Sequence, residues 1–464
     1  MSADLRSPSE ISVDLLHRYN VPGPRYTSYP TAPVWREGFD ASGYARVLEE
    51  SGGSPTPAPL SLYVHLPFCE TLCYFCACTV IITSNHSVEE PYLRLLEREI
   101  DWIAARAGRR RKVVQLQWGG GTPTYLAPER ILRLASKLRA SFSFASDAEV
   151  GVEVDPRVTT IAHLEALRNA GFNRLSMGVQ DFDPDVQKAI HRIQPFDMTR
   201  DLVRSAREMG FEGINVDLIY GLPLQTPDTF RATIDQVLEI APDRLAVYSY
   251  ANVPWLKKHQ KLLEPQLPSE RTKFEIFRTA LARFTQAGYE YIGMDHFARP
   301  DDELARARRD RTLHRNFQGY TTKAGTDLIG LGISAIGAIG DAFVQNRRDL
   351  DSYREAIRSR GAATFRGFRL SPDDRLRRAV IGNLLCHGVV AIPEVEAQYG
   401  ICFGEYFADA LEKLAPCAAD GLVEISDAEI RATSLGRVFL RNLAMAFDAY
   451  LPAQMEKPIF SRTL

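Results

Sequence analysis

The sequence predicts an α/β protein whose six parallel strands form an open, partial (β/α)6 barrel. Short runs rich in β-branched and aromatic residues alternate with long amphipathic segments, as in successive βαβ units. Several amphipathic segments begin at Ser, Thr, Asp or Pro and end at Gly, which are the residues that cap helices. Six units are fewer than the eight that close a barrel, so an open, partial barrel is favoured over a flat, doubly wound sheet.

Residues 1–59 are predicted to form an arm or cap before the main domain. Turn-rich stretches, "VPGPRYTSYPTAPV" and "SGGSPTPAPL", surround a single helical pattern, "DASGYARVLEES". The main domain is expected over residues 60–370. Its strands are "LSLYVHL", "KVVQLQW", "AEVGVEV", "NRLSMGV", "GINVDLI" and "DRLAVYSY".

Helices are expected between these strands. The patterns are "VEEPYLRLLEREIDWIAARAG", "PERILRLASKLRASF", "FDMTRDLVRSAREMG" and "TPDTFRATIDQVLEIA". After a further helix at 269–288, the apolar runs "YEYIGMDHF" and "DLIGLGISAIG" are expected to extend the sheet. Residues 371–464 are predicted to form a mainly helical, winged-helix-like domain, because "GLVEISDAEIRATSLGRVFLRNL" has the pattern of a hairpin followed by a helix.

The candidate functional motifs all follow strands. A cysteine cluster begins just after the first strand, and "GGGTPT", "DP", "QDF", "YGLP" and "ANVP" follow the second to sixth strands in turn. In an α/β sheet, ligands bind at the carboxyl ends of the parallel strands. The sequence therefore predicts that these motifs share one rim.

Composition excludes several classes of partner. The 56 Lys and Arg residues nearly balance the 58 Asp and Glu residues, so no overall field attracts nucleic acid or an anionic membrane. No apolar run approaches the roughly 20 residues of a spanning helix. The stretch "MSADLRSPSEISVDLL" has no signal-peptide pattern. We expect a cytoplasmic monomer without nucleic-acid or membrane partners.

Cys69, Cys73, Cys76 and Cys78 lie within ten positions, while Cys386, Cys402 and Cys417 are scattered and are predicted to be core residues. In a reducing compartment, such a cluster more often binds metal or performs redox chemistry than forms disulfides. The spacing of the first three suits a loop around three corners of a cubane iron–sulfur cluster, which leaves one iron open. Two alternatives are a zinc site and a cluster closed by Cys78 at the fourth corner.

The pattern Cys69-x-x-x-Cys73-x-x-Cys76, with Phe75 before the last cysteine, resembles the signature of radical S-adenosylmethionine (SAM) enzymes. Nine segments resemble, over essentially the full length, the family of oxygen-independent coproporphyrinogen III oxidases (dehydrogenases). They are "PRYTSYPTA", "LYVHLPFC", "CYFCAC", "WGGGTPTYL", "EVDPR", "RLSMGVQDF", "DLIYGLP", "GMDHFARPDDEL" and "HRNFQGYTT".

The resemblance implies an oxidoreductase of haem biosynthesis. Two propionates of coproporphyrinogen III would be oxidatively decarboxylated to vinyl groups without oxygen, through a 5′-deoxyadenosyl radical, to give protoporphyrinogen IX. Cys69, Cys73 and Cys76 would hold one [4Fe–4S] cluster, and two SAM molecules would bind. Partners would be an unidentified low-potential electron donor and an electron acceptor. Cys78 matches a family cysteine that does not ligate the cluster, and its role stays open.

The resemblance also implies which residues contact the cofactors. For the cluster-bound SAM these are Phe75, Gly121, Thr122, Gln180, Arg192, Asp217 and Ala251, and for the second SAM they are Tyr63, Gly120, Glu153 and Ile336. Glu153 has the strongest independent case, because a carboxylate at a strand end suits a cationic sulfonium or ammonium group. Since the substrate carries four propionates, Arg25 and Arg315 are candidates to bind it, although each could simply be solvated.

Two other functions fit parts of the sequence. One is a haem-binding or haem-transferring relative of the same superfamily, against which Cys78, "PRYTSYPT" and "NFQGYTT" weigh. The other is a metal-stabilised protein whose winged-helix-like tail contacts nucleic acid. That tail is not markedly basic, so few phosphate contacts are expected.

Overall fold

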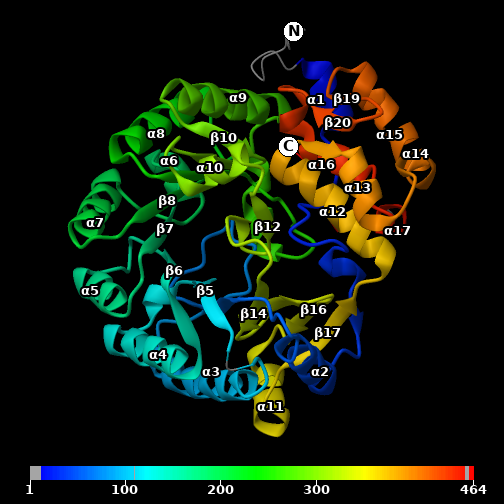
Figure 1. Ribbon diagram of the computed structural model, residues 1–464. Coiled ribbons are helices and arrows are strands. Elements are labelled where there is room, and N and C mark those ends of the chain that lie inside the picture. The colour runs from blue at the N-terminus through cyan, green and yellow to red at the C-terminus, as the bar shows by residue number, and fades with distance from the viewer. Residues whose placement is uncertain (1–11, 109, 455–458, 464) are drawn as a thin grey trace. The chain divides into compact units, whose positions relative to one another are not determined.

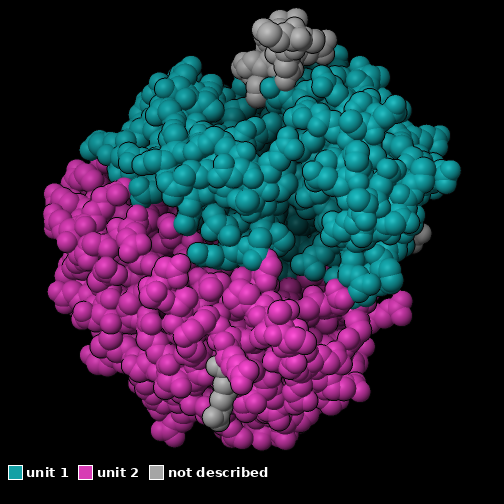
Figure 2. Space-filling model, viewed as in Figure 1, with its two compact units in different colours: residues 1–34, 218–324, 370–464 teal, residues 35–217, 325–369 magenta. Residues whose placement is uncertain are grey.

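The computed structural model describes residues 12–108, 110–454 and 459–463. These residues form two compact units, which Figure 2 colours separately. Unit 2 contains residues 35–217 and 325–369, and unit 1 contains the described residues within 1–34, 218–324 and 370–464. Unit 1 thus draws on all three predicted segments, 1–59, 60–370 and 371–464, and this three-part division stays a prediction.

Unit 2 is built on a mixed sheet. In spatial order its strands are β1 (Arg36–Glu37), β17 (Thr364–Arg369), β16 (Ala342–Asn346), β15 (Ile336–Ile339), β14 (Asp327–Leu331), β2 (Leu60–Leu66), β5 (Lys112–Gly120), β6 (Ser143–Val154), β7 (Arg174–Gln180) and the first part of β8 (Gly213–Tyr220), whose last three residues belong to unit 1. From β14 to β7 neighbouring strands run parallel. From β1 to β14 they run antiparallel. No closed barrel forms among the described residues, which confirms the predicted open α/β fold.

Five helices in the described part of unit 2 follow the parallel strands, as the alternating pattern predicts. They are α3 (Glu89–Ala104), α4 (Pro128–Ser141), α5 (Ile161–Asn169), α6 (Pro184–Ala189) and α7 (Phe196–Glu208). Two further helices lie elsewhere in the chain order: α2 (Ala41–Gly52) comes between β1 and β2, and α11 (Leu350–Arg360) comes between β16 and β17. Figure 1 shows α4, α5 and α7 along the outer side of β5, β6 and β7. Strand β2 is almost wholly buried, with Leu62 and Val64 both 0% exposed, because a parallel sheet is covered on both faces.

A buried carboxyl group joins four of these elements. Glu99 of α3 accepts hydrogen bonds from the Gly332 N–H group (2.7 Å), Asn346 Nδ2 (2.6 Å) and the Tyr353 hydroxyl group (2.8 Å). Gly332 follows β14, Asn346 ends β16 and Tyr353 lies on α11. Burial raises the pKa of Glu99 to about 7. One side chain therefore ties α3 to the antiparallel part of the sheet.

Replacing Glu99 with Ala is expected to lower the free energy of unfolding by about 3 kcal/mol, because buried donors then lack an acceptor. Urea denaturation at pH 7 measures the change. The control is Glu50→Ala, since Glu50 pairs with Arg369 on the surface with its side chain 59% exposed, and such pairs contribute about 1 kcal/mol or less. Equal losses in the two variants would contradict this role for Glu99.

Unit 1 contains the last predicted strand of the barrel. Strand β9 (Arg244–Ser249) pairs antiparallel with β11 (His296–Ala298), which pairs antiparallel with β10 (Glu290–Gly293). The N–H group of Tyr250, after β9, donates to the Tyr220 carbonyl group at the end of β8 (2.8 Å). The run "YEYIGMDHF" thus extends the sheet as predicted. The neighbouring elements are α8 (Pro227–Ile240), α9 (Glu270–Gln286), α10 (Glu303–Arg309), β12 (His314–Asn316) and β13 (Gly319–Thr321).

The C-terminal part of unit 1 is mainly helical. Its elements are α12 (Pro372–His387), β18 (Val389–Ala391), α13 (Ile392–Tyr399), α14 (Phe403–Tyr406), α15 (Ala408–Ala419), β19 (Val423–Ile425), β20 (Glu429–Ala432), α16 (Leu440–Met445) and α17 (Leu451–Gln454). Strands β18, β20 and β19 form an antiparallel sheet, which confirms the predicted hairpin. Within the described ranges, no helix combines the length and apolarity that crossing a membrane requires.

Residues from the start of the sequence are held in unit 1 by one arginine. Helix α1 (Val13–Tyr19) precedes them. The buried guanidinium group of Arg441 donates to the carbonyl groups of Gly23, Pro24, Arg462 and Thr463. The N–H group of Thr463 in turn donates to the Val21 carbonyl group (2.8 Å). This network anchors residues 21–24 without a regular secondary structure of their own.

Candidate active site

The cysteine cluster lies on a loop that is closed at its base. Strand β3 (Phe68–Cys69) pairs parallel with β4 (Ile81–Ile82). The Ile81 N–H group donates to the Pro67 carbonyl group (2.8 Å) and the Thr83 N–H group to the Cys69 carbonyl group (2.9 Å). Cys69 therefore stands at the base of a short loop, residues 70–80, that carries the other three cysteines.

The four clustered cysteines differ in exposure. All seven cysteines of the chain are thiols; Cys73 is buried, Cys69 and Cys76 are half-buried, and Cys78 is exposed. Burial raises the pKa of Cys69 to about 11 against the lowering effect of the Thr122 hydrogen bond, and charge on Cys76 or Cys73 contributes to the rise, so these three thiols are near neighbours. In the part of the chain that the structure describes, no three Cys, His, Asp or Glu side chains converge as a site for one metal ion.

The scattered cysteines only partly match the prediction. Cys386 and Cys417 are buried core residues, as predicted. The prediction is wrong for Cys402, which is exposed. Cys402 caps α14 in a surface turn that follows Gly400, whose φ of 65° ends α13 in the left-handed region.

The turn after α6 holds the cysteine loop in place. The Tyr74 N–H group donates to the Ile190 carbonyl group (3.0 Å), and His191 Nδ1 lies 2.9 Å from the Leu72 carbonyl oxygen. The rings of Tyr74 and His191 stack with their centroids 5.0 Å apart. His191 has a φ of 57°, and this left-handed conformation directs the next residue, Arg192, back under the loop.

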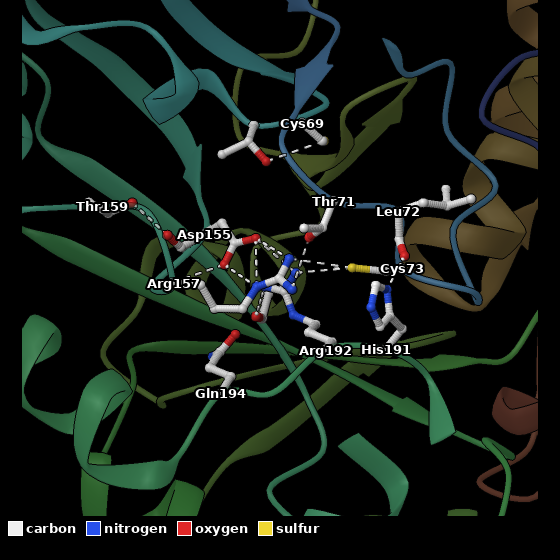
Figure 3. Close-up of polar contacts among 12 residues, drawn as sticks. Cys69, Thr71, Leu72, Cys73, Asp155, Arg157, Thr159, His191, Arg192 and Gln194 are labelled. Carbon is white, nitrogen blue, oxygen red and sulfur yellow. Dashed lines mark hydrogen bonds and ion pairs between the residues drawn. The ribbon is translucent and has the colours of Figure 1, made fainter. Parts of the chain in front are cut away.

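Two guanidinium groups and one carboxylate lie beside Cys73 (Figure 3). Asp155, which follows β6, accepts hydrogen bonds from Arg157 Nη2 (2.7 Å) and Arg192 Nη1 (3.0 Å). The same two nitrogen atoms lie 3.4 Å and 3.6 Å from Cys73 Sγ. Burial alone would raise the pKa of Asp155, but the charges of Arg192 and Arg157 hold it below its ordinary value.

The glycine-rich segment after β5 is required by close packing. Gly120 has a φ of 114°, and a Cβ atom there would lie 2.7 Å from the His65 ring. A Cβ atom on Gly121 would lie 2.6 Å from the Pro67 carbonyl group at the base of the cysteine loop. This close approach brings the Thr122 hydroxyl group to 3.4 Å from Cys69 Sγ. The predicted cofactor contacts of Gly120, Gly121 and Thr122 stay predictions.

Two buried carboxyl groups lie near the carboxyl ends of β6 and β8, the strands on either side of β7. Glu153 of β6 accepts a hydrogen bond from the Gly120 N–H group (3.2 Å), and burial followed by the charge of Asp217 raises its pKa to about 7. Asp217 of β8 accepts from Asn215 Nδ2 (2.7 Å), and burial raises its pKa to about 6. Neither forms an ion pair within the described residues, so together they favour a cationic ligand.

Two predicted SAM ligands carry buried polar atoms without partners. Arg192 Nε and Gln180 Oε1 are buried and make no hydrogen bond to any described residue. Gln180 also has a φ of 68°, a strained conformation that is typical of functional sites. An orphaned donor, an orphaned acceptor and two unpaired carboxyl groups suit a ligand with a carboxylate, hydroxyl groups and positive charge. SAM has all of these, and the three cysteine thiols suit an iron–sulfur cluster.

The other predicted cofactor residues are placed as follows. Tyr63 lies on β2 with its hydroxyl group 3.2 Å from His65 Nδ1, and burial raises the pKa of Tyr63. Phe75 lies in the cysteine loop, and Ile336 begins β15. Ala251 follows β9 and is the one predicted cofactor residue that belongs to unit 1.

The two substrate candidates lie in unit 1 and differ in how their charges are compensated. Arg25 forms an ion pair with Asp295. Arg315, on β12, stacks over the Tyr320 ring at 4.9 Å, and its buried Nε and Nη1 atoms lack hydrogen-bond partners among the residues described. His296 Nδ1 and both amide atoms of Gln318 are likewise buried and unpartnered. Arg315 thus fits a carboxylate ligand better than Arg25 does.

Sequence reasoning missed three residues of the site: Asp155, Arg157 and His191. The "DP" motif was placed on the rim without a role for its aspartate or for the arginine that follows it. Asp295 was likewise not recognised as the partner of Arg25, although it lies in the quoted segment "GMDHFARPDDEL".

Comparisons with known proteins identify the family of this chain. The radical SAM superfamily matches residues 63–237, and the HemN C-terminal domain matches residues 370–439. The oxygen-independent coproporphyrinogen III oxidase of Salmonella typhimurium is 48% identical over 97% of this chain and 98% of its own length. The Escherichia coli and Pseudomonas aeruginosa proteins of the same name are 47% and 45% identical, each over 97% of this chain and 98% of their own.

A solved structure gives the same result. The coproporphyrinogen III oxidase of Escherichia coli, described as a radical SAM enzyme, matches with a TM-score of 0.89 and 47% identity. The match covers 92% of this chain and 97% of that one. The predicted family, fold and enzyme class are confirmed, and with them a [4Fe–4S] cluster and SAM as cofactors. The chain is a radical SAM oxidoreductase and belongs to the family of oxygen-independent coproporphyrinogen III oxidases.

Proposed function

We propose that this chain oxidatively decarboxylates two propionate groups of coproporphyrinogen III to vinyl groups, which gives protoporphyrinogen IX in haem biosynthesis. The observation that carries the proposal is the 48% identity over 97% of the chain to a relative of that name. The three thiols, which are close together in the sequence, and the orphaned polar atoms of Arg192 and Gln180 support the proposal.

Cys69, Cys73 and Cys76 would hold the cluster, and Cys78 would not. When bound, the cluster and SAM supply an electron and a 5′-deoxyadenosyl radical that removes one hydrogen atom from a propionate β-carbon. The resulting –CH•–CH₂–COO⁻ group then loses carbon dioxide and one electron and becomes a vinyl group. The electron comes from a low-potential donor, and an acceptor takes up the electron that is released.

This chain's own residues would bind and orient the cofactor. Arg192 Nε is a free donor for the carboxylate of the cluster-bound SAM. Gln180 and Asp217 would take the ribose hydroxyl groups. Glu153, near the second SAM of the family, would face a positive group and would thereby remain ionised. Gln180 and Arg192 are only 8% and 6% exposed, so water would have little access to the cofactor atoms that they bind.

Unit 1 would bind the carboxylates of the substrate, and Arg315 is the main candidate. Its Nε and Nη1 atoms are buried and unpartnered in the described chain, and His296 Nδ1 and Gln318 Nε2 add further polar atoms without partners. Buried N–H donors without an acceptor are costly, and a propionate would supply that acceptor. Arg25 already has this compensation in Asp295.

Replacing Arg315 with Met is therefore expected to raise the KM for coproporphyrinogen III by about 10- to 100-fold, because a charged hydrogen bond contributes about 1.5–3 kcal/mol. SAM binding should not change. Arg25→Met is the matched control: it should instead lower the melting temperature, because Asp295 is left buried and unpaired. An unchanged KM in the Arg315 variant would contradict the assignment.

One experiment tests the function itself. The full chain is reconstituted anaerobically with iron and sulfide and incubated with a reductant, SAM and coproporphyrinogen III. We expect two vinyl groups and two molecules of carbon dioxide per substrate, with methionine and 5′-deoxyadenosine released. Formation of 5′-deoxyadenosine without any vinyl product would refute the proposed decarboxylation.

A further inference from the structure

Behind Cys73 lies a charged group of three residues whose charges do not cancel. Asp155 is shared by Arg157 and Arg192, so two cations face one anion. The side chains are only 9%, 18% and 8% exposed, respectively. Buried charges need a partner, and a cysteine that binds iron is a thiolate anion. Asp217 also interacts with the charge of Arg192. Cys73 Sγ lies within 3.6 Å of both guanidinium groups and, as a thiolate, is the nearest further anion that can offset the excess charge.

Arg157 is fixed by its own turn. Its backbone N–H group donates to Asp155 Oδ1 (3.0 Å), and its Nε and Nη2 atoms donate to the two oxygen atoms of the same carboxylate (3.0 Å and 2.7 Å). The Asp155 carbonyl group accepts from the N–H and hydroxyl groups of Thr159 (3.0 Å and 2.8 Å), which closes the turn. The guanidinium plane is thus oriented by neighbours in sequence, before any ligand binds.

The two arginines differ in whether a guanidinium nitrogen atom lacks a hydrogen-bond partner. Arg192 keeps a buried Nε atom without a partner, which suits it to a ligand carboxylate. Every guanidinium nitrogen of Arg157 has a partner: Nε contacts Asp155, Nη1 contacts Thr71 Oγ1 (3.4 Å), and Nη2 contacts Asp155 and Cys73 Sγ (2.7 Å and 3.4 Å). The hydrogen bond from Arg157 to Cys73 therefore does not depend on whether SAM is present.

We propose that Arg157 is a positioning residue that acts through Cys73 and raises the reduction potential of the cluster. Reduction adds negative charge to the cluster, so a fixed cation and an N–H···S hydrogen bond stabilise the reduced state more than the oxidised state. Mutation of a residue that hydrogen-bonds to a metal ligand typically lowers metal affinity or activity by about 10- to 100-fold. The inference rests on Cys73 as a cluster ligand and not on the identity of the substrate.

The test is a redox titration of the reconstituted full chain, without SAM or substrate, followed by electron paramagnetic resonance. Arg157→Gln is expected to disfavour reduction by about tenfold, which is a fall of about 59 mV for a one-electron couple. Arg157→Lys keeps the charge but loses the planar set of guanidinium N–H donors, so its reduction potential should fall by less. Arg94→Gln is the control, because Arg94 pairs with Glu90 on the surface of the same unit.

Iron and sulfide content separates this role from a purely structural one. An unchanged potential in the fully loaded Gln variant would overturn the proposal. Loss of iron from the Gln variant together with an unshifted potential in the loaded Lys variant would also overturn it. Because no porphyrinogen is used, either result would leave the proposed decarboxylation intact.

Discussion

The Cys76→Ser variant is expected to form 5′-deoxyadenosine at least about 100-fold more slowly than the wild type, since even outer partners of metal ligands can be worth that much. A serine oxygen is a poor iron ligand in a site built for thiolates. The fold of the loop should survive, because the β3–β4 pairing does not involve Cys76 and serine keeps the N–H group that donates to the Cys73 carbonyl group (3.0 Å). Iron and sulfide per chain and product formation measure the effect.

Cys78→Ser is the matched control two positions away. Cys78 is exposed, whereas Cys73 is buried and Cys69 and Cys76 are half-buried. The Cys78 variant should therefore keep its iron and sulfide. If it lost them while the Cys76 variant kept them, the assignment of the three ligands would be wrong.

The Glu153→Gln variant is expected to be more stable than the wild type at pH 8 and yet to bind SAM at least about 10-fold more weakly. Burial raises the pKa of Glu153 to about 7 from its ordinary value of 4.5. The unfolded chain loses this proton near pH 4.5, so wild-type stability falls as the pH rises from about 4.5 to 7. At pH 8 the buried charge costs up to about 3 kcal/mol.

Glutamine removes the charge and keeps an oxygen for the Gly120 N–H group. The stability gain should therefore be about 2–3 kcal/mol at pH 8 and close to zero at pH 4.5, where the wild-type carboxyl group is already protonated. Urea denaturation of the cofactor-free proteins at both values measures the gain, and equilibrium dialysis measures SAM binding. Parallel stability curves for the two proteins would show that Glu153 does not carry the buried charge.

The pattern of apolar residues predicted the parallel strands because each contributes several buried apolar residues and is bounded by turn residues. The antiparallel part of the sheet was harder to predict from the sequence. "DLIGLGISAIG" reads as one apolar run, but Gly332 has a φ of 95° and turns the chain, so β14 and the antiparallel β15 form instead. Strands β3 and β4 are too short to show an alternating apolar and polar pattern, although their pairing closes the cysteine loop.

The site was predictable where a motif is local and not where it depends on distant pairs. The cysteine spacing and the glycine-rich turn are contiguous in sequence, so their position at strand ends could be inferred. The contacts of Cys73 with Arg157 and Arg192 join residues 84 and 119 positions apart. The ion pair of Arg25 with Asp295 spans 270 positions. Pairs this far apart leave no periodic pattern in the sequence, so the ion pair that neutralises the charge of Arg25 could not be predicted.

The hold of Arg441 on the Gly23 and Pro24 carbonyl groups sets an order of events during synthesis. Arg441 is made 417 residues after Pro24, which at about 5–20 residues per second is a delay of roughly 20–80 s on the ribosome. For that time the Gly23 and Pro24 carbonyl groups lack the guanidinium group that donates to them. In the nascent chain these carbonyl groups must therefore stay hydrated. The segment is accessible to proteases and chaperones long after the strands that follow it have been translated.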